Sequence, residues 1–175
     1  MRTTKKITLS AMMVAMSAVL IVVGVLSGVL DLSACAVSSL LVAFVFIEIG
    51  APYTYLVWLS TSLILFISYP SSLIWLEYLG VFGIYPIIKA YIERLPRWSW
   101  LLLKLLFGNA VIIVMILLSE FITGAPFFEG IAEWWLKVGV YLFLNVAFIL
   151  YDVFMTVLVR FYFEKLRHRF KHLLK

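Results

Sequence analysis

Three of the ionisable side chains that lie inside long apolar stretches of this sequence are the first candidates for chemistry, because a charge there needs a partner or a function. They are Glu77, Lys104 and Asp152. A charged side chain inside a membrane helix is costly and is usually retained to pair with another group or to bind a ligand. At 1.5 Å per helical residue, Lys104 lies roughly 10 Å beyond Arg97 and Asp152 roughly 12 Å before Arg160. The matching depths predict an intramembrane ion pair between Lys104 and Asp152, unless Lys104 instead extends its ammonium to the lipid headgroups.

Two amide side chains accompany these charges. Asn109 and Asn145 lie at similar depth, closer to the middle of their stretches, so they can bond each other or present amides to a ligand. Glu77 stands between Trp75 and Tyr78, an aromatic setting that suits a planar or cationic ligand, although a structural hydrogen bond is the alternative. Binding pockets are mostly apolar with a few placed polar groups. We therefore predict a substrate cavity that is open to the outer face, floored by both amides and walled by Glu77, Trp75 and Tyr78.

The residue types most used in catalysis and metal binding form no constellation in this sequence. Cys35 is the single cysteine, which excludes an intrachain disulfide and a Cys-x-x-Cys metal site. His168 and His172 have the i, i+4 spacing of helical metal ligands, but they stand in a basic tail without an acidic or thiol partner. The carboxylates are scattered over separate stretches. We expect no catalytic residue, metal or cofactor, with a lipid-modifying membrane enzyme kept as an alternative.

The composition indicates the class of protein that must position these groups. The chain has 175 residues, of which 65% are hydrophobic and 13% are charged, and its mean hydropathy is +1.13. A soluble domain is about 45–50% apolar and about 25% charged. There is too little polar surface here to cover a water-soluble globule, so the sequence predicts an integral membrane protein. Little chain remains outside the bilayer for a soluble catalytic head, a nucleotide-binding domain or a nucleic-acid module.

Six apolar stretches can be separated at Gly, Pro and charged residues. Each is long enough for a membrane helix, and the strict alternation of a barrel strand is absent. We predict one transmembrane domain over residues 1–175, an all-α six-helix bundle followed by a basic tail at 164–175. Pro86 lies inside the fourth helix and should kink it, because proline removes a backbone hydrogen bond. The predicted helices span about 7–30, 33–49, 53–69, 73–92, 98–122 and 134–163.

The basic residues predict the orientation. Thirteen of the fourteen lysines and arginines lie at the N-terminus, around the connection between the fourth and fifth helices, or towards the C-terminus, and only Lys137 lies elsewhere. Cytoplasmic loops carry an excess of lysine and arginine. Both termini are therefore expected in the cytoplasm, with the protein crossing the cell membrane several times. The opposite connections hold the acidic residues Asp31, Glu120, Glu129 and Glu133.

The first helix carries two stripes of small residues. One stripe is predicted to let a neighbouring helix approach closely, above all at Gly24-xxx-Gly28. The second stripe lies roughly 120° away on the same helix. Both stripes can pack inside the bundle, or the second can dock another membrane protein. The first contains Ser10, Ser17, Gly24 and Gly28, and the second contains Ala11, Ala15 and Ala18.

A short six-helix protein with cytoplasmic termini, a basic start and an Ala-xxx-Ala first helix resembles the substrate-binding (S) component of energy-coupling factor (ECF) transporters. This resemblance implies capture of a vitamin-like small molecule from the outer face. It also implies that Ala11, Ala15 and Ala18 dock a transmembrane coupling protein, which works with two separate ATPase subunits. The absence of ATP-binding motifs from this chain fits that arrangement. The cell-shape membrane protein MreD has a similar size and topology, so a non-catalytic scaffold is the main alternative.

Overall fold

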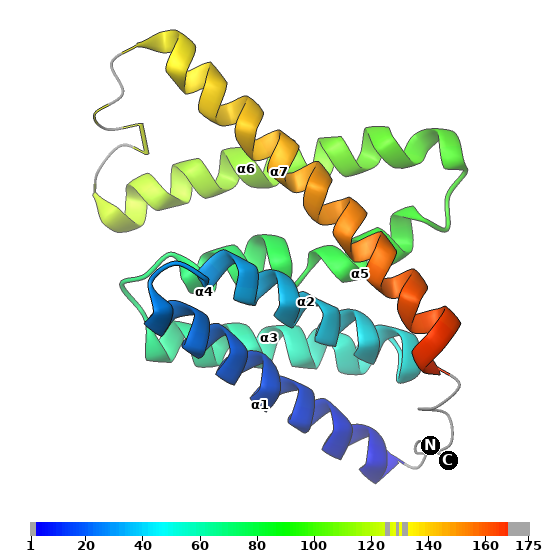
Figure 1. The fold of residues 1–175 in the computed structure, drawn as a ribbon. Helices are drawn as coiled ribbons and strands as arrows, with labels where there is room; N and C mark the ends of the chain where they lie inside the picture. Colours follow the sequence, from blue (N-terminus) through cyan, green and yellow to red (C-terminus); the bar gives the residue numbers. More distant parts are fainter. Residues whose placement is uncertain (1–2, 125–126, 129, 131–132, 168–175) are drawn as a thin grey trace.

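The computed structural model describes residues 3–124, 127–128, 130 and 133–167, and within them it contains helices and no strands. Five of the helices are long and apolar enough to span a membrane, namely α1, α2, α3, α6 and α7. The predicted all-helical class is confirmed. The elements in Figure 1 are α1 (Thr3–Ser27), α2 (Asp31–Glu48), α3 (Ala51–Ser68), α4 (Ile74–Glu77), the π-helical turn η1 (Tyr78–Phe82), α5 (Tyr85–Ile92), α6 (Arg97–Thr123), α7 (Trp134–Phe161) and the π-helical turn η2 (Tyr162–Leu166).

The turn between α1 and α2 corrects one prediction about the first helix. Gly28 lies beyond the end of α1 with φ of +70°, so it ends the helix and does not form a packing pair with Gly24. Gly24 itself lies at a close approach, because a Cβ there would be 2.4 Å from Cβ of Ala34. Only glycine fits where the two helices come this near.

The fourth predicted helix is not continuous, which is a second correction. It is divided into α4, η1 and α5, with a turn at Gly83 and Ile84. The N–H of Gly83 donates to the carbonyl of Tyr78 at 2.7 Å, five residues back. Pro86 falls in the first turn of α5, where its missing N–H leaves no hydrogen bond unmade. The proline therefore begins a new helix here and does not bend an existing one.

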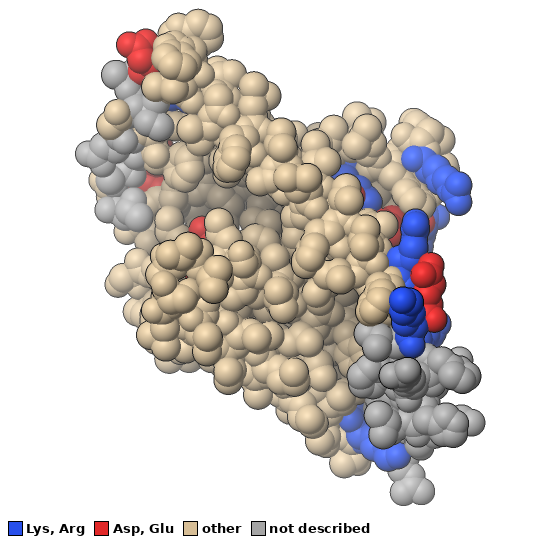
Figure 2. Space-filling model, in the orientation of Figure 1, with Lys and Arg blue, Asp and Glu red and all other residues tan. Residues whose placement is uncertain are grey.

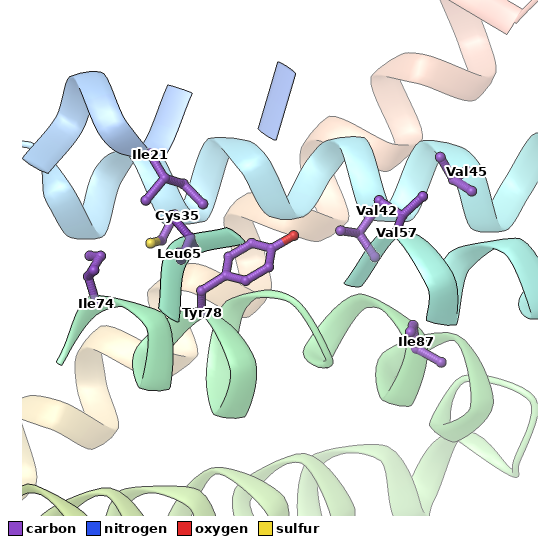
Figure 3. Close-up of a cluster of buried hydrophobic side chains, with 9 residues drawn as sticks. All are labelled: Ile21, Cys35, Val42, Val45, Val57, Leu65, Ile74, Tyr78 and Ile87. Atoms are coloured by element: carbon purple, nitrogen blue, oxygen red, sulfur yellow. The ribbon is translucent and has the colours of Figure 1, made fainter. Parts of the chain in front are cut away.

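The buried core lies in the first half of the chain. Its nine central residues all come from α1 to α5, as Figure 3 shows. In the most apolar window of α6 only 6% of residues are buried, against 28% for α1. The molecule thus consists of a packed body, α1 to α5, and a more loosely packed α6–α7 pair. The core residues are Ile21, Cys35, Val42, Val45, Val57, Leu65, Ile74, Tyr78 and Ile87.

The charges are separated along the long axis. Figure 2 shows most of the lysine and arginine side chains at one end of the molecule, the end where α6 begins and α7 ends. Asp31 and Glu133 lie at the starts of α2 and α7, at the other end. Of the residues used to predict the orientation, Arg2, Glu129 and the tail from position 168 lie outside the described residues.

Candidate functional site

A cavity of about 280 Å³ lies along the seam between the body and the α6–α7 pair. Figure 2 shows the surface hollowed between these two parts. Glu77 supplies the only carboxylate among the lining residues, and Ser119 and Tyr151 supply hydroxyls. The body contributes Leu32, Leu73, Leu76, Glu77, Val81 and Phe82, the pair contributes Ile112, Met115, Ile116, Ser119, Leu144, Ala147, Phe148 and Tyr151, and Phe127 comes from the connection between α6 and α7.

Glu77 is the last residue of α4, and its side chain is half-buried. Among the described residues no lysine, arginine or hydrogen-bond donor pairs with its carboxylate. The charged group that acts on it is Asp31, which carries the same sign. A carboxylate beside an apolar cavity without a partner is available to a ligand, and it favours one that carries an amine or a hydroxyl group.

The aromatic residues beside Glu77 in the sequence do not line this cavity. Trp75 packs edge-to-face against Phe66, with ring centroids 5.0 Å apart. Tyr78 is fully buried in the core of the body. The rings that do line the cavity are Phe148 and Tyr151 on α7, Phe82 at the end of η1 and Phe127 between α6 and α7. No sequence pattern predicts which aromatic residues line the cavity, because the lining depends on how the α6–α7 pair meets the body.

The two amides lie at the contact between α6 and α7, outside the cavity lining. The Tyr141 hydroxyl donates to Oδ1 of Asn109, and Nδ2 of Asn109 donates to the carbonyl of Leu105 at 2.8 Å. Nδ2 of Asn145 donates to the carbonyl of Tyr141 at 3.0 Å. The structure brings each amide to Tyr141, so Asn109 is part of a link between the two helices.

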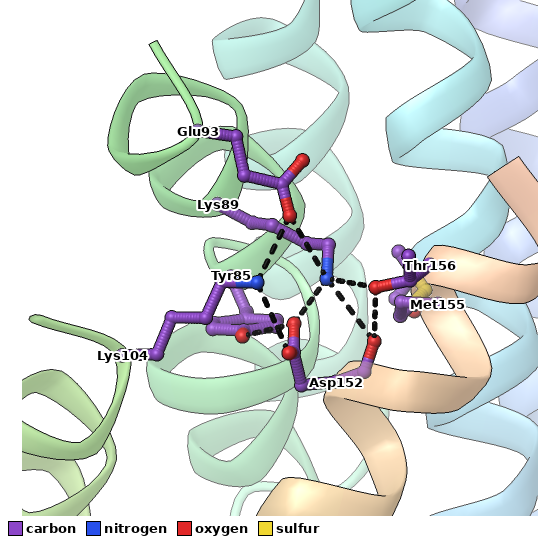
Figure 4. A network of polar contacts seen from close by, with 8 residues as sticks. Tyr85, Lys89, Glu93, Lys104, Asp152, Met155 and Thr156 are labelled. Carbon is purple, nitrogen blue, oxygen red and sulfur yellow. Dashed lines mark hydrogen bonds and ion pairs between the residues drawn. The ribbon is translucent and has the colours of Figure 1, made fainter. Parts of the chain in front are cut away.

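A network of four charges lies further along the same seam, as Figure 4 shows. Nζ of Lys104 is 3.0 Å from Oδ2 of Asp152 and 2.9 Å from Oε1 of Glu93. Nζ of Lys89 contacts Oδ1 of Asp152 and lies 3.3 Å from Oε1 of Glu93. Two ammonium groups and two carboxylates therefore balance each other. The structure places Lys104 and Asp152 together, as their depths in the sequence suggested.

Neutral groups complete this network. The Tyr85 hydroxyl donates to Oδ1 of Asp152 at 2.7 Å, and Nζ of Lys89 donates to Oγ1 of Thr156 at 2.6 Å. The Lys89 side chain is only 6% exposed. Lys89 is one of the basic residues around the connection between the fourth and fifth predicted helices, and the sequence does not predict its partners on α7. Its i, i+4 spacing to Glu93 is the one local signal, and it predicts only the pair within this segment.

Five hydroxyls in the body have no hydrogen-bond partner of ordinary geometry among the described residues, and four of them, all but that of Ser10, lie close together. These four come from α1, α2, α3 and η1, and the Tyr78 hydroxyl lies beside the other three. All four side chains are fully buried, so their polar atoms are removed from both water and lipid. The four residues are Ser17, Ser38, Thr61 and Tyr78.

The three alanines of the predicted docking stripe on α1 differ in exposure. Ala11 and Ala15 are exposed, whereas Ala18 is buried against the body. Ser10 and Ser17, from the other stripe, are buried. The exposed alanines therefore form a smooth strip on the outside of α1, towards its N-terminal end.

No protein-family model, curated protein or solved structure matches the chain. Within the described residues there is no group of three or more His, Cys, Asp or Glu side chains that could hold a metal ion. His168 and His172 lie outside the described residues. The fold and the site define an all-helical protein with several helices able to span a membrane and an apolar cavity that holds one unpaired carboxylate.

Proposed function

We propose that this chain is the substrate-capture subunit of an ECF-type transporter in the cell membrane. It takes a vitamin-like small molecule from the outer face into the Glu77 cavity. A transmembrane coupling protein and two separate ATPase subunits complete the transporter. The cavity carries this proposal, because it combines apolar walls with one unpaired carboxylate at the end of the molecule opposite to most of the basic residues.

The proposed topology has six crossings, with both termini in the cytoplasm. Five crossings are the long apolar helices, and the sixth is the broken segment from α4 to α5. That segment covers 19 residues from Ile74 to Ile92, which gives roughly 28 Å at helical rise, close to the apolar thickness of a bilayer. Broken helices at membrane depth are tolerated where protein surrounds them. The core position of Ile74, Tyr78 and Ile87 meets that condition.

The size and lining of the cavity support a particular ligand chemistry. Its volume of about 280 Å³ is near the lower limit of small-molecule pockets, which hold roughly 300–1,000 Å³. The ligand is therefore a compact and largely apolar molecule. It carries a cationic or hydroxyl group that meets Glu77, because a buried carboxylate without a partner would be costly.

The test of this site is mass spectrometry of small molecules that copurify with the protein. Wild type should retain a ligand that Glu77→Gln loses, because the amide cannot form a charge-assisted bond. Glu133→Gln is the matched control, since Glu133 is exposed and does not line the cavity. A ligand retained equally by both variants would overturn the assignment of Glu77. Absence of any enriched small molecule from the wild type would count against substrate capture.

The exposed alanines carry the partner proposal. The substitutions Ala11→Leu and Ala15→Leu should prevent assembly with the coupling protein, because bulky side chains keep helices apart. The isolated chain should keep its melting temperature, since both positions are exposed. Ala18→Leu is the comparison variant and should lower that temperature, because Ala18 is buried. Loss of folding in the Ala11 and Ala15 variants, or unchanged assembly, would contradict docking.

A scaffold of the MreD type is the second candidate, and the four-charge network favours it. Every charge in this network is balanced within the protein, so holding the helices together is a sufficient role for it. Copurification separates the two candidates. Two ATPases and a coupling protein in the complex support the transporter, whereas cell-wall elongation proteins support the scaffold.

A further inference from the structure

We propose that a second pocket, between α2, α5 and the end of α7, binds the phosphodiester group of an anionic phospholipid. This pocket holds about 450 Å³ and lies at the basic end of the molecule, away from Glu77. Its charged lining residues are Lys89, Glu93, Arg94 and Arg167. The site does not depend on the proposed transport function.

The charges that line the pocket, counted with their ion-pair partners, leave one cation over. Lys89 and Lys104 are balanced by Glu93 and Asp152, and Arg167 is balanced by Glu48. Arg94 has no carboxylate partner among the described residues. Its guanidinium lies over the Tyr91 ring, 5.1 Å from the centroid. A phosphodiester carries one negative charge, so a single such group complements the region.

Arg167 is already oriented to help bind that group. Its Nε lies 3.1 Å from Oε1 of Glu48, and its guanidinium lies 4.9 Å from the centre of the Phe163 ring. Tyr162 donates to the same Glu48 oxygen at 3.0 Å. A guanidinium has five N–H donors, so one bond to Glu48 leaves four for a phosphate oxygen. Arginine binds phosphate in a bidentate manner more readily than lysine does.

Lys89 contributes positive potential and no direct bond. Its ammonium already donates to Oδ1 and the carbonyl of Asp152 and to Oγ1 of Thr156. The two arginines are therefore the residues that would touch the phosphate. Removing either one should weaken binding of the anion without opening the four-charge network.

The remaining lining residues favour a lipid over free phosphate. Phe46, Ile47, Val159 and Phe163 provide an apolar wall that can pack against an acyl chain. The pocket also lies where α2 and α5 end, at Glu48 and Ile92. Basic pockets between membrane helices at this level bind anionic headgroups. An apolar wall beside two arginines matches a molecule with both a phosphodiester and a hydrocarbon chain.

Native mass spectrometry and thermal unfolding of the full chain in detergent test this proposal, with phosphatidylglycerol and phosphatidylcholine as probes. We expect phosphatidylglycerol to be retained and to raise the melting temperature, and phosphatidylcholine to do neither. Arg94→Gln should weaken retention at least tenfold. Arg97→Gln is the control, because Arg97 is exposed at the start of α6 and does not line the pocket.

Each other outcome overturns the proposal in a distinct way. Equal loss in Arg94→Gln and Arg97→Gln would show general attraction to a basic surface. Displacement of the lipid by millimolar inorganic phosphate, with the same dependence on Arg94, would assign the pocket to the free anion. Arg94→Gln serves as the deciding variant, because Arg94 is exposed and its replacement leaves the Glu48 pair intact.

Discussion

Asp152 and Glu77 are both carboxylates on the seam, but their surroundings give them different roles. Asp152 interacts with Tyr85, Lys89 and Lys104. Glu77 has no such partner among the described residues, and it faces an apolar cavity. This contrast supports a structural role for Asp152, and it is the reason for proposing Glu77 as the residue that meets the ligand.

Asp152→Asn should destabilise the fold by about 3 kcal/mol, because removing one member of a buried pair leaves an uncompensated charge. Thermal unfolding in detergent measures this loss. Adding Lys89→Met to Asp152→Asn should recover part of the stability by removing the unbalanced cation. Glu164→Gln, at an exposed position, should leave the melting temperature unchanged. An Asp152→Asn protein as stable as that control would mean that the network contributes nothing.

Asn109→Ala should lower stability by about 1 kcal/mol, because it removes a hydrogen bond between α6 and α7. Ligand affinity should be unchanged, since Asn109 does not line the cavity. Glu77→Gln should do the opposite, with weaker binding and no loss of melting temperature without ligand, because it removes an unpaired carboxylate. Both quantities are measured by thermal unfolding with and without the copurified ligand. Weaker ligand binding by Asn109→Ala would contradict this prediction and would mean that the amide contacts the ligand.

At the scale of elements, the broken segment α4–η1–α5 determines where Glu77 and Lys89 lie. The indole N–H of Trp58 on α3 donates to the carbonyl of Leu79 at 3.0 Å, within the π-helical turn. Gly83 packs against the same indole, because a Cβ there would be 2.5 Å from Cδ1 of Trp58. The break is thus fixed by contact with α3. It sets Glu77 at the cavity and Lys89 at the charge network.

Gly83→Ala should destabilise the protein by about 1–3 kcal/mol, because the added methyl group overlaps Trp58 and the Tyr78 carbonyl. Gly139→Ala is the matched control. Gly139 lies within α7 with nothing within 4 Å of a Cβ, so alanine should stabilise that helix by about 0.5–1 kcal/mol. Melting temperatures that move in opposite directions would support the close contact. A neutral Gly83→Ala would show that α3 and η1 can separate without cost.

The sequence predicted much of the element list and less of the site. Helical class and five of the apolar helices follow from hydropathy, since long apolar runs have few alternatives. Pro86 predicted a kink, but the π-helical turn depends on Trp58, which is distant in sequence. Lys104 and Asp152 could be matched by depth alone. The contact of Lys89 with Asp152 could not be predicted, because α6 separates α5 from α7 in the chain and the rotation of each helix about its axis is set by packing that no local pattern reveals.

At the scale of the whole molecule, the body and the α6–α7 pair meet along one seam, and the two ends of this seam differ in chemistry. The Glu77 cavity occupies one part of the seam, and the four-charge network closes another. The aromatic rings of Tyr85 and Tyr151, with centroids 5.4 Å apart, lie between them. Aromatic contacts also join the two parts, since Tyr85 packs edge-to-face on Phe148 and Phe82 packs edge-to-face on Tyr151. The pair that bounds the cavity is therefore attached to the body by both polar and apolar contacts.

The distribution of basic residues predicts the orientation of the whole chain, with thirteen of them expected on the cytoplasmic side. In a Cys35→Ser background, Phe128→Cys should react with an impermeant thiol reagent in intact cells, because it lies in the connection between α6 and α7. Leu95→Cys, between α5 and α6, should react only after lysis. Both cysteines must react in permeabilised cells, which shows that each is reactive once the reagent reaches it. Each position is then the control for the other in intact cells. Labelling of position 95 but not 128 in intact cells would invert the topology, and it would place the Glu77 cavity on the cytoplasmic face, where it could not capture an external substrate.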